Sequence, residues 1–83
     1  MSITPLAGRV RALRVASGKT RLALAFEATA YLESKALPRH RTVTADALKS
    51  YERGILPPIV VIYALAHVFD EDFHTLVDLG LVS

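Results

Sequence analysis

Polar side chains that can recognise a surface by hydrogen bonds and charge gather in one short segment, residues 43–54, with the sequence VTADALKSYERG. Asp46, Lys49, Ser50 and Arg53 recur there at helical spacing, so a helix over this segment would carry them on its outer face. Small neighbouring side chains would let such a helix approach the base edges of a DNA major groove, where bulky ones would hold it away. The chemistry that this pattern favours is therefore binding.

The same segment contains the signals that start and stop a helix. Thr44 can accept a hydrogen bond from a backbone N–H of the first turn, which makes it a helix cap. Gly54 can adopt the left-handed conformation that ends a helix. Between them, Ala47, Leu48 and Tyr51 fall on the opposite side and are expected to contact a core. The sequence thus predicts a short, capped helix with a polar free face.

Catalytic chemistry finds little support in the residue pattern. The histidines His40, His67 and His74 have no neighbouring Ser or Cys in a nucleophile motif, and the glycines form no phosphate-binding loop. His67, Glu71 and His74 have the i, i+4, i+7 spacing of a metal-binding helix face, but the acidic residues 70–72 are expected to break the helix between them. We therefore expect a protein that is not an enzyme, with no catalytic residues, no metal site and no cofactor.

Composition indicates one small globular domain over residues 1–83. Hydrophobic residues make up 52 % of the chain, and four Gly and four Pro are too few for a disordered composition. The chain has no Cys, which excludes a disulfide framework and a thiolate metal site. The first ten residues lack a secretory apolar run, and the apolar stretch 55–66 is interrupted by Pro57 and Pro58 and is too short to span a bilayer. We expect no membrane association and a location in the cytoplasm of a bacterium or a phage-infected cell.

The formal net charge of +2 conceals an uneven distribution along the chain. Residues 1–54 contain all ten Lys and Arg and four acidic residues, which gives +6, whereas residues 55–83 contain four acidic residues and no Lys or Arg, which gives −4. The basic part would attract phosphates in a salt-dependent manner. Chance clustering on a solvated surface is the alternative, and charge alone does not choose between DNA, RNA and an acidic protein.

Helical signals cover most of the chain. A first helix is expected over about residues 5–17. Thr20 caps a second helix, rich in Ala and Leu, which runs to about Ala36 because the residue before Pro38 disfavours helical geometry. After a basic loop, the capped helix with the polar free face follows over about Thr44–Arg53.

Two further helices are predicted in the acidic part of the chain. One begins at Pro57 or Pro58, since proline is tolerated in a first turn, and ends at Phe69. Its helical period is carried by Ile59, Ile62, Tyr63, Ala66 and Phe69. Its β-branched start is also typical of a strand, but the length of the pattern favours a helix. The last helix covers about residues 71–79, starts with acidic residues that suit the helix dipole, and is closed by Gly80.

Short sequence pieces occur in a fixed order along most of the chain. They are Arg9-Val10-Arg11 with Arg14, then Gly18 and Thr20, then Glu52-Arg53-Gly54, then Pro57 with Leu65, Ala66 and Phe69, and last Asp72-Phe73-His74-Thr75-Leu76. No piece is specific alone, but as an ordered set they resemble the helix-turn-helix domain of the Cro/C1 and xenobiotic-response-element repressors. The resemblance implies an all-α fold: a compact five-helix lambda-repressor-like domain, here with an extended second helix.

The chain departs from this family between its second and third helices. More residues separate the two helices than the family's tight turn contains, so residues 28–42 are interpreted as an insertion. The insertion supplies Arg39, His40 and Arg41 close to the start of the third helix, where they could reach phosphates or a minor groove. The alternative is a loop that only lengthens the scaffold.

The resemblance also implies roles for single residues. Arg14 and Glu52 match a pair that ties the first helix to the third by an ion pair, and Arg21 matches a site that contacts a phosphate. The residues expected at or beside the DNA bases are Thr44, Ala45, Asp46, Lys49, Ser50 and Arg53. Asp46 has a second interpretation as a helix-start residue that stabilises the dipole. Such a weakly polar face would leave part of the specificity to the loop and to DNA shape.

A small domain of this kind would bind two half-sites as a homodimer, and the dimer would have to use the domain's own surface. The candidate dimer residues belong to the apolar tail: Phe73, Leu76, Val77, Leu79, Leu81 and Val82. The outward side of the second helix, with Leu22, Phe26 and Tyr31, and the loop Ile55–Leu56 are alternatives, since exposed apolar patches indicate partners.

Two functional interpretations remain open at this point. The first is a sequence-specific regulator of transcription, repressor- or Cro-like, that binds double-stranded DNA. The second is a protein-interaction adaptor or antitoxin-like module on the same fold, with a protein partner and little DNA specificity. The charge distribution and the sequence of the third helix favour DNA binding. The weakly polar outer face of that helix and the insertion favour the adaptor.

Overall fold

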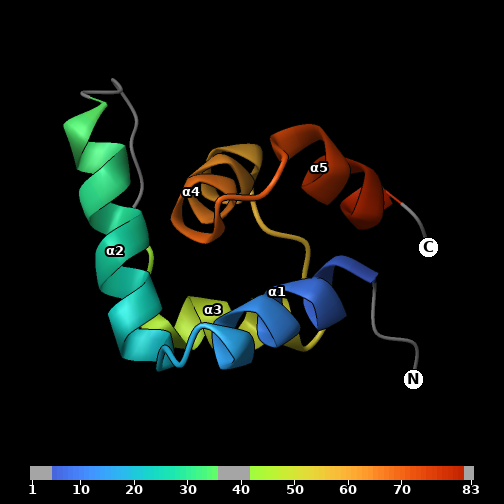
Figure 1. Cartoon of the computed structure of the whole chain (residues 1–83), viewed down its shortest axis with the longest axis horizontal. Helices are drawn as coiled ribbons and strands as arrows, with labels where there is room; N and C mark the ends of the chain where they lie inside the picture. Colours follow the sequence, from blue (N-terminus) through green and yellow to red (C-terminus); the bar gives the residue numbers. More distant parts are fainter. Residues whose placement is uncertain (1–4, 36–41, 82–83) are drawn as a thin grey trace.

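The computed structural model describes residues 5–35 and 42–81 (Figure 1). Within these ranges the chain forms five helices and no strand, so the predicted all-α fold class is confirmed. The helices are α1 (Pro5–Ala16), α2 (Arg21–Ser34), α3 (Ala45–Glu52), α4 (Ile59–Phe69) and α5 (Phe73–Leu81). The Cα radius of gyration is 11.7 Å, close to the value of about 12 Å expected for a compact chain of this length.

Two threonine caps begin α2 and α3. Thr20 Oγ1 accepts a hydrogen bond from the N–H of Ala23 at 3.1 Å, and Thr44 Oγ1 accepts one from the N–H of Ala47 at 3.0 Å. Both threonines have an extended backbone, which directs the side-chain oxygen toward the first helical turn. Each cap therefore satisfies a backbone donor that the helix itself leaves unpaired.

Residues in the left-handed region end α3 and α4. Gly54 follows α3 with a φ of 116°, and Asp70 ends α4 with a φ of 54°. Glycine adopts positive φ without a Cβ clash, and aspartate tolerates it better than most residues. Asp72 then accepts a backbone hydrogen bond in the first turn of α5. The predicted helix stop at Gly54 and the predicted break at the acidic residues are both found, so His67 and His74 lie on different helices.

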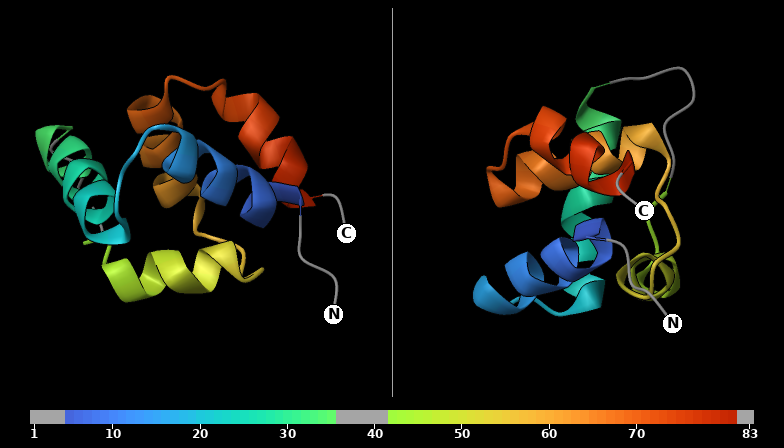
Figure 2. Two further views of the ribbon diagram at one scale, coloured as in Figure 1. Left: turned by 60° about the horizontal axis from the view of Figure 1, so that its bottom comes forward. Right: turned by 90° about the vertical axis from the view of Figure 1, so that its right-hand side faces the viewer.

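All five helices share one core. α2 packs against α3 and α4, α1 packs against α3 and α5, and α4 packs against α5. The largest fully buried side chains are Leu6, Val10, Leu24, Leu32, Leu48, Val61, Leu65 and Leu76. In Figure 2 (left) α3 forms the lower edge of the molecule, and the connection between α4 and α5 lies at the opposite edge. None of the helices among the described residues is long and apolar enough to cross a membrane.

The buried side of α4 differs from the predicted one. Ile59 is 64 % exposed and Tyr63 is also exposed, whereas Val61, Ile62 and Leu65 are buried. α4 contacts α1, α2 and α5, so its buried side is wider than a single stripe and is centred on other residues. The apolar period identified the helix correctly but assigned Ile59 and Tyr63 to the wrong side.

Helix ends also differ from the predicted ones. α2 ends at Ser34, and Ala36, the predicted last residue, lies outside the described residues. The prediction that Gly80 closes the last helix is wrong, because α5 continues to Leu81. A Cβ at Gly80 would lie 2.9 Å from Cδ1 of Leu56. This glycine is therefore explained by the close approach of a neighbouring side chain and not by helix termination.

Candidate nucleic-acid interface

The outer side of α3 presents polar groups on one accessible face. Its exposed residues are Thr44, Asp46, Lys49, Ser50 and Arg53, and Ala45 beside them is half-buried. Leu48 and Glu52 on the inner side of the helix are buried. α3 packs against α1 and α2 and lies at one edge of the molecule (Figure 2). The structure thus brings together the α3 residues that the sequence assigned to DNA contact.

A buried ion pair fixes the end of α3 to α1. Arg14 Nε lies 2.7 Å from Glu52 Oε2, and Arg14 Nη2 donates to Glu52 Oε1 at 3.1 Å. Arg14 Nη1 also donates to the carbonyl oxygen of Lys19 at 3.1 Å. The hydrogen bond to Glu52 raises the pKa of Arg14, although desolvation acts in the opposite direction. A bidentate pair of this geometry positions the helix as well as balancing the charge.

Arg21 joins the same carboxylate from the first turn of α2. Its Nη2 lies 3.3 Å from Oε1 of Glu52, and its Nε is buried without a hydrogen-bond partner among the described residues. The Arg21 side chain is 39 % exposed, whereas that of Glu52 is 3 % exposed. One carboxylate therefore binds two guanidinium groups, and the cluster keeps a positive charge. Sequence reasoning assigned Arg21 to a phosphate and missed this contact with Glu52.

The start of α3 is fixed to the middle of α2 by a side chain that sequence reasoning also missed. The N–H of Val43 donates to Thr29 Oγ1 at 2.9 Å, and the Thr29 hydroxyl donates to the carbonyl oxygen of Val43 at 3.1 Å. Val43 itself is buried. The only sequence signal was a hydroxyl residue inside an otherwise apolar segment of α2.

Two cations on α3 are available to an anionic partner. Lys49 and Arg53 are exposed, and the ion pairs found within residues 5–35 and 42–81 all use other cations. They are one helical turn apart, so both lie on the outer side of α3. The other predicted cations of this region, Arg39, His40 and Arg41, lie outside the described residues.

An apolar hollow of about 340 Å³ adjoins the start of α3. Leu22 and Phe26 of α2 line it together with Thr44 and Ala45. Phe26 is 76 % exposed and Leu22 is also exposed, whereas Tyr31 is half-buried against the core. Of the three residues predicted on the outward side of the second helix, two are thus accessible.

The candidate dimer surface needs a correction at its centre. Leu76 is fully buried, with no exposed area, because it faces the core that α5 closes. Phe73, Val77 and Leu79 are partly buried and pack against the same core, and Val82 lies outside the described residues. Leu81 is 74 % exposed, and Ile55 and Leu56 of the preceding loop are also exposed. The accessible apolar surface at this end is therefore Leu81 with Ile55 and Leu56.

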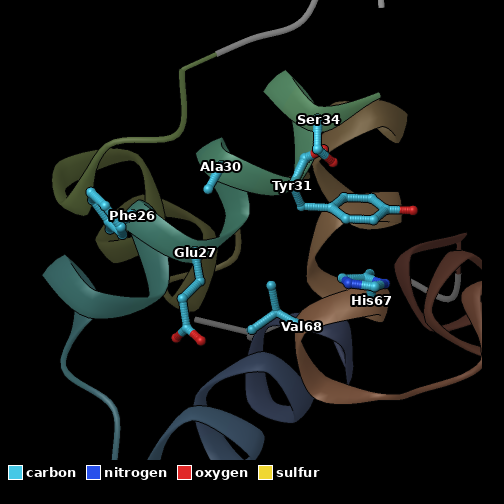
Figure 3. A pocket seen from close by; sticks show the side chains of 7 residues that line it. All are labelled: Phe26, Glu27, Ala30, Tyr31, Ser34, His67 and Val68. Atoms are coloured by element: carbon cyan, nitrogen blue, oxygen red, sulfur yellow. The ribbon is translucent and has the colours of Figure 1, made fainter. Parts of the chain in front are cut away.

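His67 takes part in an aromatic contact that the sequence did not predict. Its ring stacks on that of Tyr31, with centroids 3.9 Å apart and planes inclined by 16° (Figure 3). This contact depends on how α2 crosses α4, for which no local sequence pattern gives a signal. No group of three His, Asp or Glu in the described part of the chain is arranged to hold a metal ion, so the spacing of His67, Glu71 and His74 does not become a metal-binding cluster there.

Comparison with known proteins gives no assignment. No protein-family model matches the chain, and no curated protein or solved structure matches it significantly.

Proposed function

We propose that the chain is a double-stranded DNA-binding regulator of transcription, with a lambda-repressor-like helix-turn-helix fold of the Cro/C1 type and an extended second helix. The observation that carries the proposal is the exposed polar side of α3, held at its start by Thr29 and at its end by Glu52. A helix supported at both ends loses little conformational freedom when it enters a groove, and such preorganisation favours specific binding.

Residue roles follow from charge and reach. Lys49 and Arg53 contact phosphates or bases beside them, and the exposed part of Arg21 contacts a phosphate. The short side chains Ala45, Asp46 and Ser50 meet base edges in the major groove: Ser50 by hydrogen bonds, Asp46 by accepting from a cytosine amino group, and Ala45 against a thymine methyl group. In the proposal Thr44 lies at the same groove edge, and the basic residues 39–41 reach the backbone or the minor groove.

The proposal is tested by fluorescence anisotropy. A labelled duplex from the region beside the gene is titrated over a salt series and compared with a scrambled duplex. We expect tight binding, a steep salt dependence and a clear preference for the native sequence. Equal and weak binding to both duplexes would remove the DNA-binding proposal.

A double variant separates base reading from folding. Lys49→Ala with Ser50→Ala removes exposed groups only, so the free energy of unfolding should change little. Preference for the native duplex should fall about ten-fold or more, because a good base contact contributes about 1–3 kcal/mol of discrimination. Arg9→Gln, which removes an equal charge on α1 that is paired with Glu71, should leave the preference unchanged.

Binding as a homodimer is part of the proposal. The end of α5 and the loop before α4 are adjacent, since Leu56 Cδ1 is close enough to limit the space at Gly80. Leu81, Ile55 and Leu56 therefore form one exposed apolar patch, which a second copy would cover. Two copies related by a two-fold axis would match paired half-sites.

A second candidate function has one specific observation in its favour. Exposed Leu22 and Phe26 beside the start of α3 suit a protein surface better than a phosphate backbone. An adaptor that uses this surface would bind both duplexes weakly and would be indifferent to changes at Lys49 and Ser50.

A further inference from the structure

Aromatic rings form a curved wall where α2, α4 and α5 meet. Tyr31 stacks on His67, and its ring centroid lies 5.7 Å from that of Tyr63, with planes inclined by 50°. Tyr63 in turn meets Phe73 edge to face at 5.5 Å and 83°. Because the rings are inclined to one another, their faces and edges surround a common space instead of forming a flat stack.

That space is a hollow of about 380 Å³ with acidic groups at its rim. Its walls are Tyr31, Tyr63, Ala66, His67, Asp70, Glu71 and Phe73. Glu71 Oε1 already binds Arg9 at 2.8 Å. Asp70 is exposed and forms no ion pair with any residue in the described part of the chain. Aromatic faces and a free carboxylate together suit a positively charged organic group.

The chain already places one of its own cations on this wall. Lys35 Nζ lies over the ring of Tyr31, 5.2 Å from the centroid. A second hollow of about 440 Å³ continues along α2 and shares Tyr31 and His67 with the first (Figure 3). The surface is thus long enough for more than one side chain of an extended partner.

Asp70 is the unpaired charge of the hollow among the described residues. Residues 55–83 contain four acidic residues and no Lys or Arg. The hollow includes residues at the connection between α4 and α5. That connection lies at the edge opposite α3 in Figure 2 (left). At the hollow itself Arg9 pairs with Glu71 and Lys35 lies over Tyr31, so the attraction for a positively charged partner comes from the carboxylate of Asp70, well away from the cations of α3.

We propose that this hollow binds the guanidinium or ammonium group of an Arg or Lys side chain, presented by a basic segment of a partner protein. The charged group lies against the ring of Tyr63, because His67 and Lys35 already contact the Tyr31 ring, and Asp70 pairs with it at the rim. Metal ions are poor candidates, because aromatic carbon supplies most of the wall and oxygen ligands are few. The inference does not depend on the proposed binding of DNA.

Tyrosine fluorescence reports on this site directly. The chain has three Tyr and no Trp, and two of the three, Tyr31 and Tyr63, line the hollow. The probe is a blocked peptide with two arginines separated by glycine, and the matched control contains citrulline, a neutral analogue of arginine, at both positions. We expect a saturable change in fluorescence with the arginine peptide and none with the citrulline peptide.

Two variants test the assignment of residues. Asp70→Asn removes the charge while keeping a residue that tolerates the left-handed backbone found there. It should weaken peptide binding about five-fold, the effect of losing one exposed ionic contact. Asp78→Asn removes the same charge from an exposed position of α5 outside the hollow, so affinity should not change. Tyr63→Ala, at an exposed position, should abolish the saturable change.

Several results would overturn the inference. One is equal binding of the arginine and citrulline peptides; another is an Asp70→Asn variant that binds as tightly as the wild type. Tighter binding of tetramethylammonium than of the arginine peptide would reject a protein side chain as the occupant. Titration of the Asp70→Asn variant with the native duplex keeps the two proposals separate, since its DNA affinity should equal that of the wild type.

Discussion

At the scale of single residues, Glu52 ties the end of α3 to both α1 and α2. Its carboxylate binds Arg14 from α1 and Arg21 from α2, and only 6 % of the residue is exposed. A buried charge is tolerated only when it is paired and hydrogen-bonded. The three side chains therefore depend on one another, and the loss of the carboxylate would leave two cations at the junction of three helices.

Glu52→Gln should destabilise the fold by about 3 kcal/mol, the lower end of the range for breaking a buried pair, because Arg21 retains access to solvent. Urea unfolding measures this change. Glu33→Gln, at an exposed position of α2, should stay within about 0.5 kcal/mol of the wild type. If the two variants were equally stable, the ion pairs would contribute little to the fold.

Tyr31 gives a prediction for alkaline pH. The hydrogen bond with the Tyr63 hydroxyl, followed by desolvation, raises the pKa of the Tyr31 phenol above its ordinary value of about 10. The folded state thus holds this proton more tightly than the unfolded state does. The resulting stabilisation is complete below the ordinary tyrosine pKa and is lost as the pH rises through the raised value.

Tyr63→Phe should therefore lower the pKa of Tyr31, since the hydroxyl partner is removed. Ultraviolet absorbance of tyrosinate against pH measures the titration. Tyr51→Phe, which changes a tyrosine of α3 outside the aromatic wall, should leave the titration of Tyr31 unaltered. A Tyr31 pKa unchanged by Tyr63→Phe would show that desolvation alone causes the shift.

At the scale of helices, α2 acts as the support for α3. The Thr29 hydroxyl accepts from the N–H of Val43 and donates to its C=O, and so fixes the chain just before the Thr44 cap. Thr29→Val has nearly the same shape but leaves the N–H and C=O of a buried residue without this partner. We expect a loss of about 2 kcal/mol in the free energy of unfolding.

The Thr29→Val variant should also bind DNA less tightly, because the start of α3 is no longer fixed. Chemical denaturation and duplex anisotropy measure the two effects. Thr42→Val, a change of the same type at an exposed position, is the matched control and should alter neither quantity. A stable Thr29→Val variant with wild-type DNA affinity would contradict the role given to this side chain.

Helix caps and stops were predictable because they depend on residues close together in the sequence. Thr20, Thr44 and Gly54 act through the backbone of their own turn, whatever the rest of the fold does. The side of α4 that is buried depends instead on three neighbouring helices, and the period therefore assigned Ile59 and Tyr63 incorrectly. The interpretation of Gly80 as a helix stop was wrong for a similar reason. The side chain that limits the space at Gly80 belongs to Leu56, which is distant in the sequence.

The candidate site divides in the same way. Asp46, Lys49 and Ser50 share one face because helical spacing requires it, and that was readable from the sequence. The contact of Arg21 with Glu52 and the hydrogen bonds of Thr29 to Val43 depend on how α2 crosses α3. No spacing rule relates residues of two helices whose crossing is unknown, so these contacts needed the structure.

At the scale of the whole molecule, the basic and the acidic surfaces have different locations. The free cations of α3 lie at one edge, and the acidic connection between α4 and α5 lies at the opposite edge (Figure 2). The exposed residues Ile55 and Leu56 follow the end of α3 directly, where the N–H of Ile55 donates to the carbonyl oxygen of Ser50 at 3.1 Å. The proposed DNA-binding face and the proposed site for a basic partner therefore do not overlap, so occupation of one should not block the other.

Leu81→Lys tests the surface proposed for the second copy. A charge at this exposed position should convert a dimer to a monomer while leaving the fold intact, because Leu81 contributes little to the core. Sedimentation equilibrium measures the mass. Val15→Lys, at an exposed apolar position of α1, should remain dimeric. A dimer that persists in Leu81→Lys would shift the search for the interface to Leu22 and Phe26.

The bonds between Thr29 and Val43 fix the register of α3 without using the covalent path between residues 35 and 42. Changes in the length of that path, with Arg39, His40 and Arg41 retained, should then leave the start of α3 in place, provided that the path can still reach across. Residues 42–54 could therefore be exchanged as one unit. The new segment would carry different residues on the exposed side of α3, and the other helices would stay unchanged. Thr29, Arg14 and Arg21 would be kept, because Thr29 binds Val43 and the two arginines bind Glu52.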